Sequence, residues 1–287
     1  MARAWPRAAQ LIIKYIAFYF DVSIQQLMQR VIALDTEFDR RTTYRPTLSI
    51  VQVKCGAHEE PKIYDVLGHC DDLNELVELL RDDSIVKVIH AARQDFECIY
   101  CQFGITMHNV FDTQVAAKHL GFGDEIGYAQ LVKEFCDKKI VKERKLQVSD
   151  WLKRPLTQKQ IFYAKQDVEY LHLAYEHMQE RFLTDRKPYE EFLKECRAME
   201  NESLYKFNPL AVWKKMHNKF RVVRDREFAR DLFITREREA HIHNLPREFV
   251  LTNKDLILFA NTKNKNVLQK LHKKVSPQPF LNCLAWH

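Results

Sequence analysis

Apolar residues in the first third of the chain fall into short runs that are rich in β-branched side chains. Such runs are typical of strands, whereas apolar residues spaced three and four apart indicate helices. We expect strands over 31–38, 48–55, 62–66 and 85–90, and helices over 72–81 and 94–102. Three strands, a helix, a strand and a helix in this order indicate a mixed α/β sheet.

From residue 113 onward the spacing of apolar residues is helical, and no further strand is predicted. We expect helices over 113–120, 127–136, 157–183, 189–201, 209–217, 225–241, 253–261 and 265–273. Pro188 and Pro209 interrupt this pattern, so we place a domain boundary between about 185 and 208. The prediction is an α/β domain over residues 1–190 and a small all-α domain over residues 205–287.

Charge is divided unevenly between the two parts of this chain of 287 residues, whose formal net charge is +6. Residues 185–287 carry 21 Lys and Arg against 13 Asp and Glu, whereas residues 1–184 carry 24 against 26. A basic back half beside a near-neutral front half favours a polyanionic partner that is bound partly by the back half.

The compartment is indicated by the cysteines and by the N-terminus. Seven cysteines, odd in number and scattered, favour reduced thiols and therefore a cytoplasmic protein. The apolar stretch 11–20 is broken by Lys14 and is too short to span a bilayer, so no membrane partner is expected. We expect residues 1–20 to form a first strand or helix; because they contain no acid, organellar targeting is the alternative.

Carboxylates occupy positions in the predicted elements that would bring them together. Asp35 and Glu37 lie two apart at the end of the first strand, so they project from the same face. Two adjacent carboxylates repel each other unless a cation lies between them, which favours metal binding over an exposed strand end. Asp95 begins a helix just after the strand 85–90, a position that the helix dipole alone also favours.

A phenol and a further carboxylate share one helix face, because Tyr163 and Asp167 are four residues apart. Asp167 could complete a metal site while the hydroxyl of Tyr163 orients a water; a packed helix aromatic is the alternative for Tyr163. Oxygen ligands without a His or Cys cluster favour Mg²⁺ or Mn²⁺ over Zn²⁺. Four carboxylates and a phenol suit two divalent cations and an attacking water, as in two-metal phosphodiester hydrolysis.

These residues, in this order, resemble the DEDD superfamily of 3′–5′ exonucleases, in the subgroup whose third motif has Tyr four residues before the last Asp. The flanking sequences resemble ribonuclease D in particular, over residues 28–183. The segments that carry this resemblance are Leu34–Phe38, Thr43–Pro46, Ser49–Val53, His90–Asp95, Phe111–Gln114 and Ser149–Thr157. The resemblance implies an RNase H-like fold for the first domain.

The same resemblance implies roles for the residues singled out above. Asp35, Glu37, Asp95 and Asp167 would be the metal ligands, and Tyr163 would orient the attacking water. Together they would form the catalytic centre of a metal-dependent 3′–5′ exoribonuclease that holds two divalent cations. The products would be 5′-mononucleotides, and the substrates would be tRNA precursors or other small structured RNAs with single-stranded 3′ ends.

The back half resembles a helicase and ribonuclease D C-terminal (HRDC) domain less closely. The resemblance is carried by Asn208–Trp213, Arg236–Ala240 and Leu245–Val250. Many members of that family have Trp-Arg where this chain has Thr235-Arg236. The three segments nevertheless lead us to expect an HRDC-like nucleic-acid-binding domain over 205–287. We expect the protein to be a monomer.

Two alternative functions stay open at this point. A DNA 3′–5′ exonuclease of the same subgroup would use the same carboxylates, although no polymerase domain is visible and the flanking motifs favour ribonuclease D. A catalytically silent RNA-binding module is the alternative outside enzymes. If the protein is an exoribonuclease, we expect Lys142, Arg144 and Lys145 to contact RNA phosphates near the cleft; a solvated helix and loop is the other interpretation.

Overall fold

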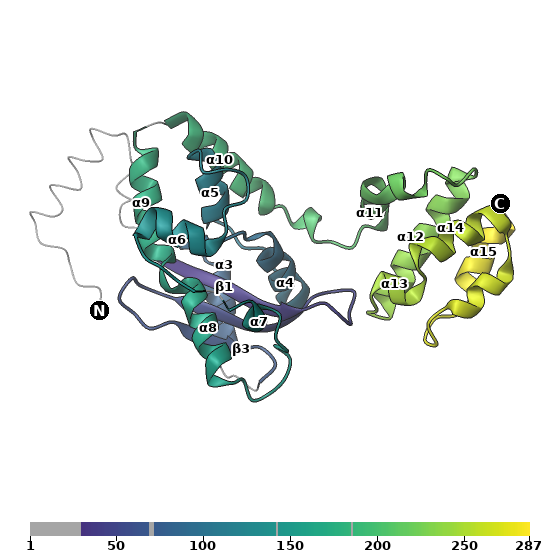
Figure 1. Ribbon diagram of the computed structural model, residues 1–287, viewed down its shortest axis with the longest axis horizontal. Coiled ribbons are helices and arrows are strands. Elements are labelled where there is room, and N and C mark those ends of the chain that lie inside the picture. The colour runs from purple at the N-terminus through teal and green to yellow at the C-terminus, as the bar shows by residue number, and fades with distance from the viewer. Residues whose placement is uncertain (1–29, 69–71, 142, 185) are drawn as a thin grey trace, which may run out of the picture. The chain divides into compact units, whose positions relative to one another are not determined.

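The computed structural model describes residues 30–68, 72–141, 143–184 and 186–287 (Figure 1). They form two compact units. The first contains the described residues up to Glu37 together with Leu48–Leu204, and the second contains Phe38–Thr47 together with Tyr205–His287. A short segment that begins with the last two residues of the first strand therefore belongs with the helical back half of the chain.

A five-stranded mixed sheet forms the centre of the first unit. Its strands are β1 (Val31–Asp39), β2 (Thr47–Lys54), β3 (Lys62–Asp65), β4 (Val86–Ile89) and β5 (Val110–Asp112), in the spatial order β3-β2-β1-β4-β5. Strand β4 is parallel to both β1 and β5, while β3 is antiparallel to β2. The predicted mixed α/β sheet is thus confirmed.

Helices cover the sheet in the first unit. They are α3 (Leu73–Arg81), α4 (Arg93–Phe103), α5 (Thr113–His119), α6 (Tyr128–Cys136), α7 (Arg144–Gln147), α8 (Gln158–Glu169), α9 (Leu171–Phe182) and α10 (Arg186–Met199), followed by the 3₁₀ turn η1 (Glu202–Leu204). Ala33, Val88 and Phe111 lie side by side on three adjacent strands and join one buried apolar core with α5, α6, α9 and α10. Figure 1 shows these four helices grouped together.

The single helix predicted over 157–183 is wrong, because α8 ends at Glu169 and α9 begins at Leu171. The hydroxyl of Tyr128 is inserted at the break: it donates to the carbonyl of Gln166 (3.1 Å) and accepts from the backbone N–H of Tyr170 (3.2 Å). In a continuous helix that N–H would donate to that carbonyl directly. A side chain inserted into the hydrogen-bond ladder is a known cause of helix kinks, and it comes here from a distant part of the chain.

Several short elements also differ from the predictions. Strand β5 was not predicted, because three buried residues are too few to show a strand pattern. Helices α7 and α15 (Gln278–Trp286) were likewise missed, and the helix expected over 265–273 is the 3₁₀ helix η3 (Lys265–Lys270). The carboxamide of Asn264 accepts from the N–H of Asn266 and favours this tight turn.

The second unit is a small bundle of helices. Its elements are α11 (Pro209–Met216), η2 (His217–Phe220), α12 (Arg226–Ile242), α13 (Arg247–Val250), α14 (Asn253–Thr262), η3 and α15. Asn208 and Asp225 cap α11 and α12 through their side chains, which explains where both helices begin. Buried aromatic residues such as Phe228, Phe233 and Phe259 form the core.

Ionic contacts inside this bundle explain one of the sequence motifs. Arg236 and Glu237 are fully buried and paired (3.3 Å), and Glu237 also pairs with Arg247 (3.3 Å). Within the same unit, the hydroxyl of Tyr44 donates to Glu237 (2.9 Å), so the Thr43–Pro46 motif is tied to the helical bundle. In the part of the chain that the structure describes, none of the helices combines the length and apolar character needed to cross a membrane.

Candidate metal centre

Three carboxylates from two elements converge in the first unit. Asp35 and Glu37 project from one face of β1, while Thr36 between them is buried on the other side of the strand. Asp167 comes from α8 and is buried. One carboxylate oxygen of each residue lies within 4.8 Å of the others. The structure therefore brings together three of the four carboxylates singled out in the sequence.

The donor set fits a divalent cation. Three negative charges at this separation repel one another strongly when they are partly shielded from water, so a cation between them relieves the repulsion. Carboxylate oxygens are the ligands that Mg²⁺ and Mn²⁺ prefer, and no thiol or imidazole belongs to this group of three. Asp35, Glu37 and Asp167 can thus hold a hard divalent cation.

Tyr163 lies one helical turn before Asp167 and is only 4% exposed. Burial raises the pKa of its phenol above the ordinary value, and the charges of Asp167, Glu37 and Asp35, together with a hydrogen bond to Asp167, raise it further. The phenol therefore stays protonated near neutral pH. This supports a role as hydrogen-bond donor at the edge of the carboxylate group rather than as a base.

Asp95 lies in the first turn of α4, outside the group of three carboxylates. It is buried and accepts a hydrogen bond from the hydroxyl of Thr36, the residue between Asp35 and Glu37. The pKa of Asp95 is raised to about 7. Burial is the main cause, the neighbouring carboxylate of Asp112 raises the pKa further, and the hydrogen bond from Thr36 opposes both. A role of Asp95 in supporting a second cation stays a prediction.

Two residues near the site were not given a role from the sequence. Asp112 is buried and accepts from the backbone N–H groups of Ala91 (3.0 Å), Ala92 (2.8 Å) and Gln114 (2.8 Å), so it fixes the turn that leads into α4 and Asp95. The only sequence signal for Asp112 was its position in the motif Phe111–Gln114. Tyr128 had none; its hydroxyl donates to the carbonyl of Gln166, the residue before Asp167. Burial raises the pKa of Tyr128 well above the ordinary value.

Both ends of α8 are held firmly, and this fixes Tyr163 and Asp167. At the start, Thr157 and Gln160 form a capping box, and the amide of Gln160 donates to the hydroxyl of Ser149 (3.1 Å). At the end, the buried ammonium group of Lys54 from β2 donates to the carbonyl of Glu169 (3.1 Å) and pairs with its carboxylate (2.9 Å).

We predict that Thr157→Ala lowers the free energy of unfolding of the α/β unit by about 1 kcal/mol, because the N–H of Gln160 loses its acceptor. Chemical denaturation monitored by circular dichroism measures this change. Thr157→Ser keeps the oxygen and is expected to stay within about 0.5 kcal/mol of wild type. Equal destabilisation by both replacements would contradict a capping role.

The basic residues predicted to contact RNA are only partly described. Arg144 and Lys145 lie on α7, and both are exposed. Lys142 lies outside the described residues. The exposed position of the first two is compatible with phosphate contacts, and their role stays a prediction.

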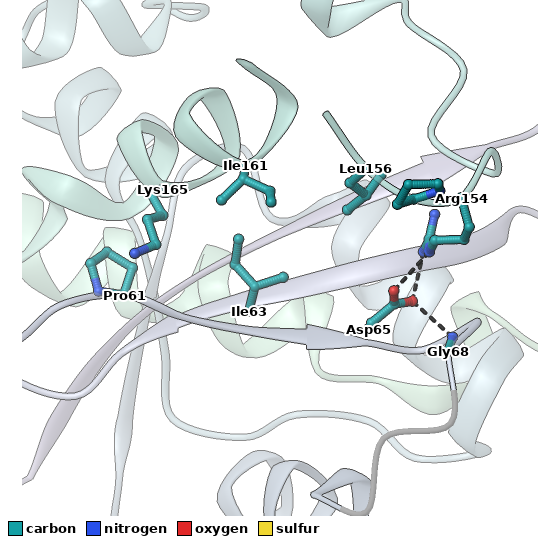
Figure 2. A pocket seen from close by; sticks show the side chains of 9 residues that line it. Pro61, Ile63, Asp65, Gly68, Arg154, Leu156, Ile161 and Lys165 are labelled. Carbon is teal, nitrogen blue, oxygen red and sulfur yellow. Dashed lines mark hydrogen bonds and ion pairs between the residues drawn. The ribbon is translucent and has the colours of Figure 1, made fainter. Parts of the chain in front are cut away.

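An open pocket of about 710 Å³ is lined by Ile161 and Lys165 of α8, which lie on a different face of that helix from Tyr163 and Asp167. Figure 2 shows Ile161 and Lys165 of α8 across from Pro61 and Ile63. The wall is mainly apolar. Its charged side chains are paired, since the Lys165 ammonium group pairs with Glu60 (3.3 Å) and Arg154 pairs with Asp65 (2.6 Å). None of the three carboxylate residues lines this pocket. We therefore assign the chemistry to the carboxylate group and not to the pocket.

Comparisons with known proteins agree with this geometry. A family model described as 3′-5′ exonuclease matches residues 18–182. Ribonuclease D of Nitrobacter hamburgensis is 35% identical over 221 residues, which are 77% of this chain and 56% of that protein. This chain thus spans less than two thirds of the length of that relative.

Solved structures agree as well. The crystal structure of Escherichia coli RNase D, described as an exoribonuclease involved in structured RNA processing, matches with a TM-score of 0.75 and 29% identity over 95% of this chain and 72% of that one. Brucella melitensis NrnC with bound Mg²⁺ matches with a TM-score of 0.54 and 26% identity over 66% of this chain and 89% of that one. The predicted relationship to ribonuclease D is confirmed, and the chain belongs to the 3′–5′ exonuclease family.

Proposed function

We propose that this protein is a metal-dependent 3′–5′ exoribonuclease. The observation that carries the proposal is the convergence of Asp35, Glu37 and Asp167 beside the buried phenol of Tyr163. Membership of the 3′–5′ exonuclease family supports the direction of attack. Similarity to ribonuclease D and to a described exoribonuclease supports RNA as the substrate.

Each residue has a defined task in this proposal. Asp35, Glu37 and Asp167 hold the divalent cations, Mg²⁺ or Mn²⁺, and Asp95 supports the second of two. When bound, such cations lower the pKa of the attacking water and stabilise charge on the leaving 3′-oxygen. Tyr163 stays protonated and orients the water by hydrogen bonding. The Mg²⁺ bound to the related NrnC supports the choice of metal.

The proposed substrates are tRNA precursors or other small structured RNAs with single-stranded 3′ ends, which are shortened to 5′-mononucleotides in the cytoplasm. The helical unit supports a nucleic-acid partner. Its segment 214–226 carries six exposed Lys and Arg side chains against one carboxylate, and such a run attracts phosphates. We assign this unit an HRDC-like, nucleic-acid-binding role.

The test is digestion of a 3′-extended tRNA precursor that is labelled at its 5′ end, beside a matched single-stranded DNA. With Mg²⁺ or Mn²⁺ we expect an RNA ladder that shortens from the 3′ end, and with EDTA no ladder. Degradation of the DNA alone would favour the DNA exonuclease. Intact RNA and DNA under every condition would favour the silent RNA-binding module.

We predict that joint replacement of Lys142, Arg144 and Lys145 by alanine weakens RNA binding and flattens its salt dependence. Each lost phosphate contact lowers the slope of log affinity against log salt by about 0.7 for single strands, so the full loss is about 2. Fluorescence anisotropy with a labelled RNA at several salt concentrations measures the slope.

A matched control removes three basic side chains elsewhere, by replacing Lys187, Lys194 and Arg197 of α10 with alanine. The net charge falls by the same amount, so the control is expected to change the slope by less than about 0.5. The same slope in both triple variants would reject a local phosphate contact by the segment 142–145.

A further inference from the structure

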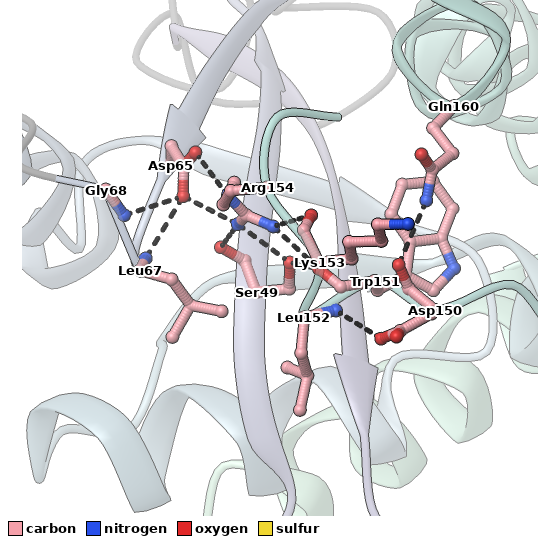
Figure 3. Close-up of polar contacts among 10 residues, drawn as sticks. All are labelled: Ser49, Asp65, Leu67, Gly68, Asp150, Trp151, Leu152, Lys153, Arg154 and Gln160. Carbon is pink, nitrogen blue, oxygen red and sulfur yellow. Dashed lines mark hydrogen bonds and ion pairs between the residues drawn. The ribbon is translucent and has the colours of Figure 1, made fainter. Parts of the chain in front are cut away.

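The loop between α7 and α8 is tied to the edge of the sheet by one arginine. Arg154 donates from Nε to one carboxylate oxygen of Asp65 (2.7 Å) and from Nη2 to the other (2.6 Å), as Figure 3 shows. Asp65 is the last residue of the edge strand β3. This two-point pairing fixes the plane of the guanidinium group as well as its position.

The same guanidinium group also holds the backbone of the loop. Nη1 of Arg154 donates to the carbonyl of Trp151 (2.8 Å), and Nη2 donates to the hydroxyl of Ser49 on β2 (3.0 Å). The hydroxyl of Ser49 in turn donates to the carbonyl of Trp151 (2.5 Å). The carbonyl of Trp151 therefore receives two hydrogen bonds from groups that are anchored on two strands (Figure 3).

Trp151 carries this constraint to the candidate site. Its indole is 2% exposed and packs against the ring of Tyr163, with ring centroids 6.1 Å apart. Ile50 of β2 and Ala164 of α8 complete the same apolar cluster. A shift of the Trp151 backbone would thus change the surface against which the phenol of Tyr163 lies.

We propose that the Arg154–Asp65 pair is a positioning device that sets the place of Tyr163 through Trp151. This inference rests on the proposed exonuclease function, and it adds two residues that do not belong to the carboxylate group. Arg154 and Asp65 are positioning residues and not catalytic ones.

The magnitude of two effects separates this role from a general contribution to stability. The pair is partly exposed, with 25% of Arg154 and 33% of Asp65 accessible, so water screens its contribution to stability. After loss of Arg154, Ser49 still donates to Trp151, and the N–H groups of Leu67 and Gly68 still donate to Asp65. By contrast, a displacement of about 1 Å in a positioned group can cost about 10²-fold in rate.

A double-mutant cycle tests the device. In the wild-type background, Arg154→Ala is expected to lower kcat by about 10- to 100-fold, with KM and Mn²⁺ affinity changed by less than about twofold and Tm lowered by no more than about 4 °C. Arg154→Lys keeps the positive charge but cannot form the two-point pairing of the guanidinium group, so it is expected to recover only part of the rate. In a Tyr163→Phe background, Arg154→Ala is expected to cost less than about threefold, because the group through which it acts is gone.

Equal fold losses in the two backgrounds would show that Arg154 does not act through Tyr163 and would overturn the proposal. An unchanged kcat in the first background would overturn it as well. The Asp65→Ala variant is expected to reproduce the Arg154→Ala result, and the two replacements together are expected to cost little more than either alone.

A ¹⁹F NMR spectrum distinguishes a failure of the proposed function from a failure of the positioning device. The chain contains four tryptophans, so 5-fluorotryptophan labelling gives a simple spectrum in which Trp151→Phe assigns one signal. Arg154→Ala is expected to shift or broaden the Trp151 signal alone. Wild-type protein without nuclease activity would contradict the proposed function, whereas an unchanged Trp151 signal in Arg154→Ala would contradict the device whatever the activity.

Discussion

Asp35→Asn and Asp167→Asn are each expected to lower kcat on RNA by at least about 10³-fold, because each removes a charged ligand from the group that would hold the cations. Each of these two residues contributes a carboxylate oxygen to the group of three oxygens that lie within 4.8 Å of one another. Calorimetric titration with Mn²⁺ is expected to show a large loss of affinity in both variants. Single-turnover digestion of a 5′-labelled RNA measures the rate.

Thermal unfolding separates loss of the metal from loss of the fold. In EDTA, both variants are expected to have a Tm equal to or above that of wild type, because one of three mutually repelling charges is gone. Added Mg²⁺ is expected to raise the Tm of wild type but not that of the variants, since a ligand stabilises only a protein that binds it.

The control is Glu60→Gln, which removes one negative charge at a side chain that is 89% exposed. Its rate and Mn²⁺ affinity are expected to stay within about twofold of wild type, because an exposed surface charge contributes little. Retention of activity by Asp167→Asn, or an equal loss in Glu60→Gln, would argue against a catalytic role of the carboxylate group.

Tyr163→Phe is expected to lower kcat by about 10²-fold while Mn²⁺ affinity stays within about twofold of wild type. The phenylalanine ring keeps the packing against Trp151, and only the hydroxyl that would orient the water is lost. The effect is smaller than that of a lost ligand because all three carboxylates remain in place. Calorimetry and single-turnover digestion on the same preparations measure both quantities.

Tyr175→Phe provides the matched control for this phenol. Tyr175 lies on α9 and packs in the core of the first unit against Phe111 (ring centroids 4.8 Å apart). We expect less than about a threefold change in kcat, because the lost hydroxyl belongs to a core cluster that contains none of the three carboxylate residues. A loss of metal binding in Tyr163→Phe as large as that in Asp167→Asn would show that the hydroxyl does more than orient the water.

Local periodicity was sufficient to predict the centre of the site. Alternation along a strand places Asp35 and Glu37 on one face, and helical spacing places Tyr163 and Asp167 on another, so each pair can be read without knowing the fold. The structure brings the two pairs together. The resemblance to ribonuclease D added the RNase H-like fold and the roles of the site residues.

The contacts between distant segments could not be predicted from the sequence. The hydroxyl of Tyr128 that ends α8 comes from α6, and nothing in the local pattern of 157–183 reveals it. Asp95 lies outside the group of three carboxylates and accepts a hydrogen bond from Thr36, a contact between residues 59 positions apart. Likewise, Tyr44 joins the helical unit through Glu237, 193 positions away.

The metal centre is tested most directly by the anomalous scattering of Mn²⁺ in crystals of the wild-type protein soaked with the ion and a short RNA. We expect Mn²⁺ peaks that are bound by carboxylate oxygens of Asp35, Glu37 and Asp167. Manganese bound at other acidic residues, with these three carboxylates left without a peak, would contradict this expectation.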